Sequence, residues 1–132
     1  MKTKGFTLVE LLVVIAILAI LATVSVVGYT TYIKNANESL ALQEMTQVKS
    51  SIMAEDIVNN DFSIASNGTV TNVKKTDADT TDYFNTYLNT LEANLNGTLE
   101  YANGKVTYTS KKADGPTAVL NLADGSVTVT TP

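Results

Sequence analysis

The stretch KGFTLVELLVVIAILAILA, residues 4–22, decides the fold, because it places one carboxylate at the start of a long apolar run. From residue 11 to residue 27 only Thr23 and Ser25 are not apolar. A membrane-spanning helix needs about 20 predominantly apolar residues, and this run supplies them. A charge at the centre of such a helix costs about 2.5–3.5 kcal/mol. Glu10 therefore requires a specific explanation.

Lysines on both sides of the run bear on its orientation. Lys2 and Lys4 precede it, and the positive-inside rule then keeps the N-terminus in the cytoplasm, although Lys34 on the far side weakens this signal. A secretory signal peptide is the alternative, but its apolar region has about 7–15 residues and ends at a cleavage site. The run here is longer and continues into a helical pattern. We therefore expect a retained membrane span over residues 6–32.

The order of residues at the start of the run resembles the N-terminal signature of type IV pilins and pseudopilins. Lysines, Gly5 and Phe6 come first, Glu10 follows four residues later, and a long apolar helix begins. The resemblance implies that a membrane-embedded prepilin peptidase cuts between Gly5 and Phe6, which makes residues 1–5 a prepilin leader. It also implies N-methylation of the new Phe6 amino group. Cleavage before the apolar run leaves the span on the mature protein.

The resemblance also gives Glu10 a role in assembly. Once Phe6 is the N-terminus, Glu10 lies about one helical turn from a positive amine and from the positive end of the helix dipole. The family's mode of assembly implies that Glu10 pairs with the Phe6 amine of a neighbouring subunit. Truncating one partner of such a buried pair typically costs about 3–5 kcal/mol. The alternative is that Glu10 lies at the headgroup level, in contact with water and lysine.

The segment after the apolar run has poorer helix formers. Residues 23–33 combine five β-branched residues in their first eight positions with Gly28, and the proline that the family often carries in this region is absent. This composition predicts a weak point around Gly28, where the helix stretches or melts in a filament.

Apolar residues at helical spacing continue beyond the span. Ala41, Met45, Val48 and Ile52 recur at intervals of three to four residues, whereas Lys34, Glu38, Glu44 and Lys49 fall among the intervening polar positions. The pattern predicts a helix that continues to about Val58. One helix over residues 6–58 would be about 80 Å long at 1.5 Å per residue. Its upper half would pack in an extracytoplasmic domain of residues 33–132.

A short second helix is predicted after a polar, turn-rich loop over residues 66–82. The apolar side chains of DYFNTYLNTLEANL share one helical face, Thr81 is a candidate N-cap and Gly97 follows the end: Phe84, Leu88, Leu91, Leu95.

Two hairpin signals follow, Asn103-Gly104 and Asp124-Gly125, each between alternating β-rich runs. Two-residue turns at these sites predict the pairs Tyr101–Val106, Leu99–Tyr108, Leu122–Val127 and Leu120–Val129. The expected fold class is α+β: a long N-terminal helix, a short second helix and an antiparallel sheet of about four strands.

Composition limits the chemistry. The net charge is −4 from 9 lysines and 13 carboxylates, so we expect no direct nucleic-acid binding. Cysteine and histidine are absent from the sequence, which removes thiolate and imidazole ligands and the usual nucleophile–base pairs. We expect no enzyme activity and no cofactor. Asp77, Asp79 and Asp82 offer oxygen ligands for calcium but lack EF-hand spacing, so a helix-capping loop is the preferred interpretation.

These observations favour a structural subunit that forms a homo-oligomeric helical filament, an extracellular type IV pilus, with the pilus assembly machinery. The precursor would lie in the cytoplasmic (inner) membrane and the product at the cell surface. A pseudopilin of a type II secretion or DNA-uptake machine is the alternative, and a membrane-tethered binding domain or enzyme is a remote one. Adhesion, motility, secretion and DNA uptake all stay open as roles.

Overall fold

A computed structural model describes residues 4–58, 62–72 and 82–132 of the chain. Its first helix, α1, runs over Leu8–Val58, so the predicted end at Val58 is confirmed. The chain divides into two compact units, Met1–Asn35 and Ala36–Pro132. The α+β class is confirmed, with a second helix and two antiparallel sheets in the C-terminal unit.

In the N-terminal unit, α1 exposes its whole surface. Every described side chain from Lys4 to Asn35 is exposed, and most of them are apolar. Among the described residues, only α1 is long and apolar enough to cross a membrane. The helix is continuous through Gly28, and apart from the neighbouring helix backbone nothing lies within 4 Å of the position that a Cβ there would occupy. A weak point at Gly28 in a filament stays a prediction.

The serine and threonine hydroxyls along this part of α1 donate to carbonyls of the same helix. Ser25 and Thr30 donate to the carbonyls of Leu21 and Val27 at 2.7 and 2.9 Å. Hydrocarbon offers no hydrogen-bond partners, so a spanning helix must satisfy its polar groups internally. These side chains therefore fit a lipid environment.

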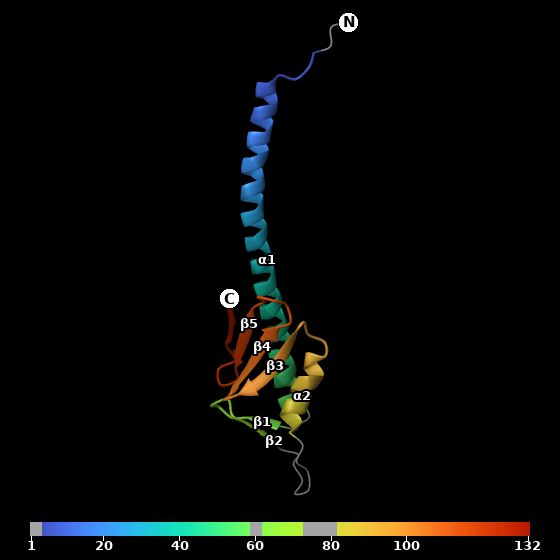
Figure 1. The fold of residues 1–132 in the computed structure, drawn as a ribbon. Coiled ribbons are helices and arrows are strands. Elements are labelled where there is room, and N and C mark those ends of the chain that lie inside the picture. The colour runs from blue at the N-terminus through green and yellow to red at the C-terminus, as the bar shows by residue number, and fades with distance from the viewer. Residues whose placement is uncertain (1–3, 59–61, 73–81) are drawn as a thin grey trace. The chain divides into compact units, whose positions relative to one another are not determined.

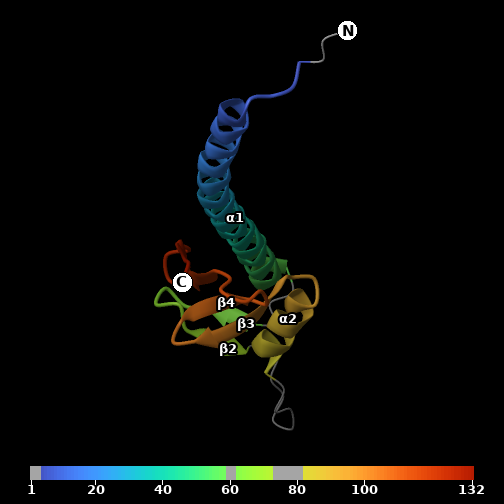
Figure 2. The same cartoon turned by 45° about the horizontal axis from the view of Figure 1, so that its top comes forward.

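The C-terminal unit packs two sheets and α2 with the last turns of α1 (Figure 1). Its other elements are β1 (Phe62–Ile64), β2 (Val70–Asn72), α2 (Tyr83–Glu92), β3 (Gly97–Ala102), β4 (Lys105–Ser110), β5 (Thr117–Asn121) and β6 (Val127–Thr130). β1 pairs with β2, and the other strands form a sheet in the order β3-β4-β5-β6. Figure 2 shows α2 beside β3.

One buried cluster joins these elements. The apolar stripe of α1 supplies Ala41, Met45, Val48 and Ile52, as its spacing predicts, and each is at most 1% exposed. The other buried members are Phe62, Phe84, Leu88, Leu99, Val106, Tyr108, Ala118 and Leu120. Alternate residues of the strands face this cluster, which is the reason that a half-buried sheet shows period-two alternation.

The first predicted hairpin is confirmed in its register. Tyr101 faces Val106 and Leu99 faces Tyr108. Asn103 and Gly104 both have positive φ, 52° and 75°, as a two-residue turn of type I′ requires.

The second predicted register is wrong by two residues. Leu120 faces Val127, and Val129 faces Ala118 rather than Leu120. The predicted two-residue turn does not form, because Asp124 does not adopt positive φ and instead accepts the Ser126 N–H at 2.8 Å. A shift of two keeps the same faces, so the apolar residues still meet the core.

The second helix is shorter than predicted. It ends at Glu92, and its N-cap is Asp82, whose side chain accepts the Asn85 N–H, whereas Thr81 lies outside the described residues. Gly97 opens β3 rather than closing the helix. A Cβ at Gly97 would lie 2.2 Å from the Tyr108 ring, so the packing of that ring requires a glycine.

Some residues of the predicted loop over 66–82 form a strand. β2 pairs with β1, and neither strand was expected from the sequence. Tyr101 fixes β2 from the larger sheet, because its hydroxyl accepts the Val70 N–H at 3.1 Å. Three-residue strands carry too few alternating positions to be recognised, and here a tertiary contact stabilises them.

Candidate processing and assembly site

The start of α1 is closed by a reciprocal pair of hydrogen bonds between Thr7 and Glu10. The Thr7 N–H donates to Glu10 Oε2 at 2.8 Å, and the Glu10 N–H donates to Thr7 Oγ1 at 3.2 Å. This is a capping box, in which an N-cap hydroxyl and a glutamate three residues later satisfy two backbone donors of the first turn. The cap was not predicted from the sequence, although the Thr-x-x-Glu spacing before an apolar run signals it.

Gly5 and Phe6 precede the helix. Neither lies in regular secondary structure, and the Phe6 side chain is 93% exposed. Nothing lies within 4 Å of the position that a Cβ at Gly5 would occupy. The bond between the two residues is therefore in accessible chain outside the helix, which suits entry into the active site of a peptidase.

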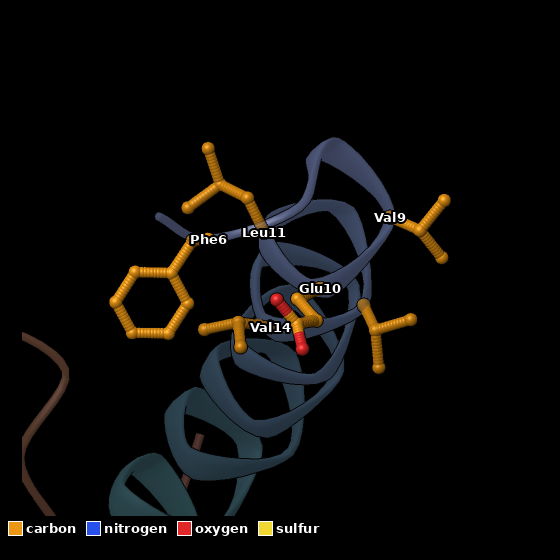
Figure 3. Close-up of a pocket in the computed structure, with 6 residues that line it drawn as sticks. Phe6, Val9, Glu10, Leu11 and Val14 are labelled. Carbon is orange, nitrogen blue, oxygen red and sulfur yellow. The ribbon is translucent and has the colours of Figure 1, made fainter. Parts of the chain in front are cut away.

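Glu10 lies on an apolar surface. It lines a shallow groove together with five apolar side chains, shown in Figure 3: Phe6, Val9, Leu11, Val13 and Val14. Glu10 is the one ionisable residue of this groove. A positive group that docked there would meet a carboxylate already oriented by Thr7, because the capping box fixes the side chain toward the N-terminal end of α1.

A second glutamate, Glu44, lies in the C-terminal unit and is only 7% exposed. Its Oε1 accepts the Asn96 N–H at 3.2 Å and the Asn96 side-chain amide at 2.6 Å. Among the described residues its Oε2 has no hydrogen-bond partner. Burial, together with the nearby Glu44 carboxylate, raises the pKa of the Tyr108 phenol. Glu44 is thus one of the intervening polar positions of the helical pattern, but the structure buries it.

The helical periodicity of α1 places Glu44 next to the buried Met45. Periodicity alone does not identify the hydrogen-bond partner of Glu44, which is Asn96. Asn96 is 52 residues away in sequence. The contact ties α1 to the chain just before β3, and it has a structural role in the domain.

The candidate calcium loop lies mostly outside the described residues. Asp77 and Asp79 are not among them, and Asp82 caps α2. The residues that the structure describes contain no group of three or more carboxylates able to hold a metal ion.

Comparison with known families locates the N-terminal signature. Residues 1–26 match the model of the prokaryotic N-terminal methylation motif, the prepilin signature of type IV pilins and pseudopilins. No curated protein and no solved structure matches the chain. The match includes Gly5, Phe6, Thr7 and Glu10, and thus the whole capping box.

The motif implies processing by a prepilin peptidase, and the exposed apolar helix fits an inner-membrane precursor. Residues 1–26 thus carry the signature of type IV pilin-like and pseudopilin precursors. Cleavage after Gly5, methylation of Phe6 and the assembly role of Glu10 stay predictions for the individual residues.

Proposed function

We propose that this chain is a structural subunit that polymerises, after leader cleavage, into an extracellular type IV pilus. The observation that carries the proposal is the position of Glu10. It is a carboxylate on an otherwise apolar helix surface, inside the matched methylation motif and one turn from Phe6.

Cleavage between Gly5 and Phe6 would place a positive amine one residue before Thr7. The capping box uses Glu10 Oε2 for the Thr7 N–H, and a carboxylate accepts further hydrogen bonds at both oxygens. A neighbouring subunit's amine can then pair with Glu10 without undoing the helix cap. This pairing would set the axial register of each added subunit.

The exposed apolar surface of residues 8–33 would supply the rest of the interaction. In the bilayer it faces lipid, and in a filament it would face the same surface of neighbouring helices. Both environments are apolar, so transfer costs little for these side chains, whereas the Glu10 charge gains a partner only in the filament. The subunit would act by assembly and catalyse no reaction.

The test is the intact mass and N-terminal sequence of the chain in two fractions, sheared cell-surface material and membranes. Wild type is compared with Glu10→Ala, Glu10→Gln and Glu100→Ala. Glutamine keeps the acceptor of the capping box but removes the charge. Glu100 is an exposed carboxylate on β3 and serves as the matched control.

We expect sheared wild-type and Glu100→Ala chains to begin at methylated Phe6. Both Glu10 variants should fall about 100-fold or more in the sheared fraction while their membrane pools persist, in line with the roughly 3–5 kcal/mol cost of an unpaired buried charge. Equal shedding of Glu10→Gln would show that the charge is not used.

The pseudopilin alternative makes a different prediction at the cell surface. A pseudopilin would be cut at the same bond and would depend on Glu10, but electron micrographs would show no long filaments. A chain that stays uncut in the membrane and is indifferent to Glu10 would instead indicate a tethered binding domain.

A further inference from the structure

Three asparagines of the C-terminal unit are each followed by glycine: Asn67-Gly68, Asn96-Gly97 and Asn103-Gly104. In such a pair the backbone nitrogen of the glycine can attack the asparagine side chain, because glycine has no side chain of its own to obstruct the approach. The sequence alone does not distinguish the three pairs, whereas the structure holds each of them differently.

The reaction of such a pair is spontaneous and needs only water. The glycine nitrogen loses its proton and bonds to the side-chain carbonyl carbon of the asparagine, and the side-chain amino group leaves as ammonia. A five-membered succinimide ring remains. Water then opens the ring at either carbonyl, which gives aspartate or isoaspartate without any oxidation or reduction. Asparagine is accordingly one of the thermolabile residues of proteins.

Ring closure needs a particular backbone conformation at the asparagine. A flat ring eclipses the Cα–Cβ bond with the bond to the glycine nitrogen, which sets ψ at about −120°, the value at the first central residue of a type II′ turn, where φ is positive. A type I′ turn becomes type II′ when the peptide between its two central residues rotates, and both types suit a two-residue hairpin. Asn103 is the one asparagine among the described residues with positive φ, 52°, and it occupies this turn position.

No hydrogen bond opposes the rotation at Asn103. Within residues 4–58, 62–72 and 82–132, neither the Asn103 carbonyl nor the Gly104 N–H makes a hydrogen bond, and the Asn103 side chain makes none. That side chain is exposed, so ammonia can leave and water can enter. The next peptide stays anchored, because the Gly104 carbonyl accepts the Leu122 N–H at 3.0 Å.

The pair at Asn67 is held at both reacting groups. The Gly68 N–H, which would be the nucleophile, donates to the Ala65 carbonyl at 2.8 Å. The side-chain oxygen Oδ1 of Asn67 accepts the Thr69 N–H at 3.0 Å. Both hydrogen bonds must break before the ring can close.

The pair at Asn96 is held by contacts from distant parts of the chain. The Asn96 side-chain amide donates to the buried Glu44 carboxylate at 2.6 Å. The Asn96 carbonyl accepts the Lys111 N–H at 3.0 Å, so rotation of the peptide that joins Asn96 to Gly97 would break this bond as well.

We propose that Asn103 is a site of spontaneous covalent modification, where the Asn103-Gly104 pair converts through a succinimide to aspartate and isoaspartate. Either product places a new carboxylate on the exposed turn between β3 and β4, and isoaspartate also adds one carbon to the main chain. A Cβ at Gly104 would lie only 3.3 Å from the Gly68 carbonyl carbon, so the added carbon disturbs a close contact between two turns. This inference concerns the folded C-terminal unit and does not depend on the proposed function.

The test follows the full chain in detergent micelles in mildly alkaline buffer, which removes the glycine proton more often, and compares it with the same chain unfolded in guanidinium. Cleavage after glutamate puts the three sites on separate peptides, because Glu92 and Glu100 lie between them. Mass spectrometry measures the replacement of NH2 by OH at each site. Electron-transfer fragmentation separates isoaspartate from aspartate.

In the unfolded chain we expect similar rates at the three sites, since each is then an unstructured Asn-Gly pair. In the folded chain Asn103 should react about tenfold or more faster than Asn67 and Asn96, because each of those sites must first break two hydrogen bonds. Asn103→Gln should remove most of the mass gain of the folded chain, because glutamine would have to close a larger ring. Asn67→Gln is the matched control and should leave the mass gain unchanged.

Equal protection of all three sites in the folded chain, or a faster reaction at Asn67 or Asn96 than at Asn103, would overturn the proposal. If Asn103→Gln disturbs the hairpin, the rates at the three sites of the wild-type chain still decide, because they are measured in one sample.

Discussion

Residues 8–35, which we call the span segment, and residues 36–58, the packed segment, belong to the same helix, but the protein buries side chains of the packed segment alone. In the span segment every side chain is exposed, and apolar residues lie all round the helix. In the packed segment a stripe from Ala41 to Ile52 is buried by the chain's own sheets. A helix that is apolar all round therefore indicates a surface that lipid or other subunits must cover. A helix with apolar residues on one face indicates packing against a core.

The two segments also use glutamate differently. Glu10 lies on an exposed apolar surface and caps the helix, so its charge is available to another molecule. Glu44 is buried and bonds Asn96 of its own domain. Substitutions at these two positions should therefore affect different measurements.

Matched isoleucine truncations give the largest expected contrast in stability. Ile52 is 1% exposed and Ile20 is 64% exposed. Ile52→Ala should lower the free energy of unfolding of the domain by about 2–5 kcal/mol, whereas Ile20→Ala should change it by less than about 0.5 kcal/mol. Denaturant unfolding in detergent, followed by near-ultraviolet circular dichroism, measures both. Similar losses would mean that the span segment also packs on the domain.

The buried glutamate gives the next effect. Glu44→Ala leaves the two Asn96 donors without their acceptor, at a cost of about 1–3 kcal/mol. Glu44→Gln keeps a carbonyl oxygen there and should cost less. The same unfolding measurement on Glu10→Ala should equal wild type. A loss in Glu10→Ala as large as that in Glu44→Ala would remove the distinction between the two glutamates.

The capping box predicts a local effect at the start of α1. Thr7→Val removes the hydroxyl that accepts the Glu10 N–H, and N-cap losses cost about 0.5–2 kcal/mol. Amide hydrogens of the first turn should exchange faster in Thr7→Val, by up to about 30-fold. Thr7→Ser, which keeps the hydroxyl, should match wild type. Unchanged exchange in Thr7→Val would show that the cap does not stabilise the first turn.

The smallest expected effect depends on pH and lies at the β5–β6 turn. The Ser126 hydroxyl and N–H both donate to Asp124 and lower the pKa of its carboxyl. A lowered pKa in the folded state contributes stability above the ordinary aspartate value, about 3.9, and this stability is lost as the pH falls through the folded-state pKa. Asp124→Ala should therefore melt below wild type at neutral pH, and the gap should close in acid. A gap that grows in acid would contradict this assignment.

Local signals in the sequence were enough to predict several structural elements. The stripe from Ala41 to Ile52 predicted the packed face of α1, and the Asn103-Gly104 turn predicted its hairpin register. Both predictions depend on residues that are close in sequence: the first on the helical period of apolar residues, the second on the conformation that a two-residue turn requires. The failures at Asp124-Gly125 and at the end of α2 have another origin. Hydrogen bonds to the Asp124 side chain overrode the local turn preference, and Gly97 serves the packing of the Tyr108 ring at the start of β3 instead of ending the helix.

The sequence by itself was enough to recognise the prepilin signature. An apolar run of spanning length and the order of Gly5, Phe6 and Glu10 are properties of the chain read in order. Only the tertiary structure decided that Glu44 is buried against Asn96, that Tyr101 fixes β2, and that Lys112 lies beside Asn37. Each of these contacts joins residues at least 31 positions apart, and pairings at such distances form only when the core brings the elements together.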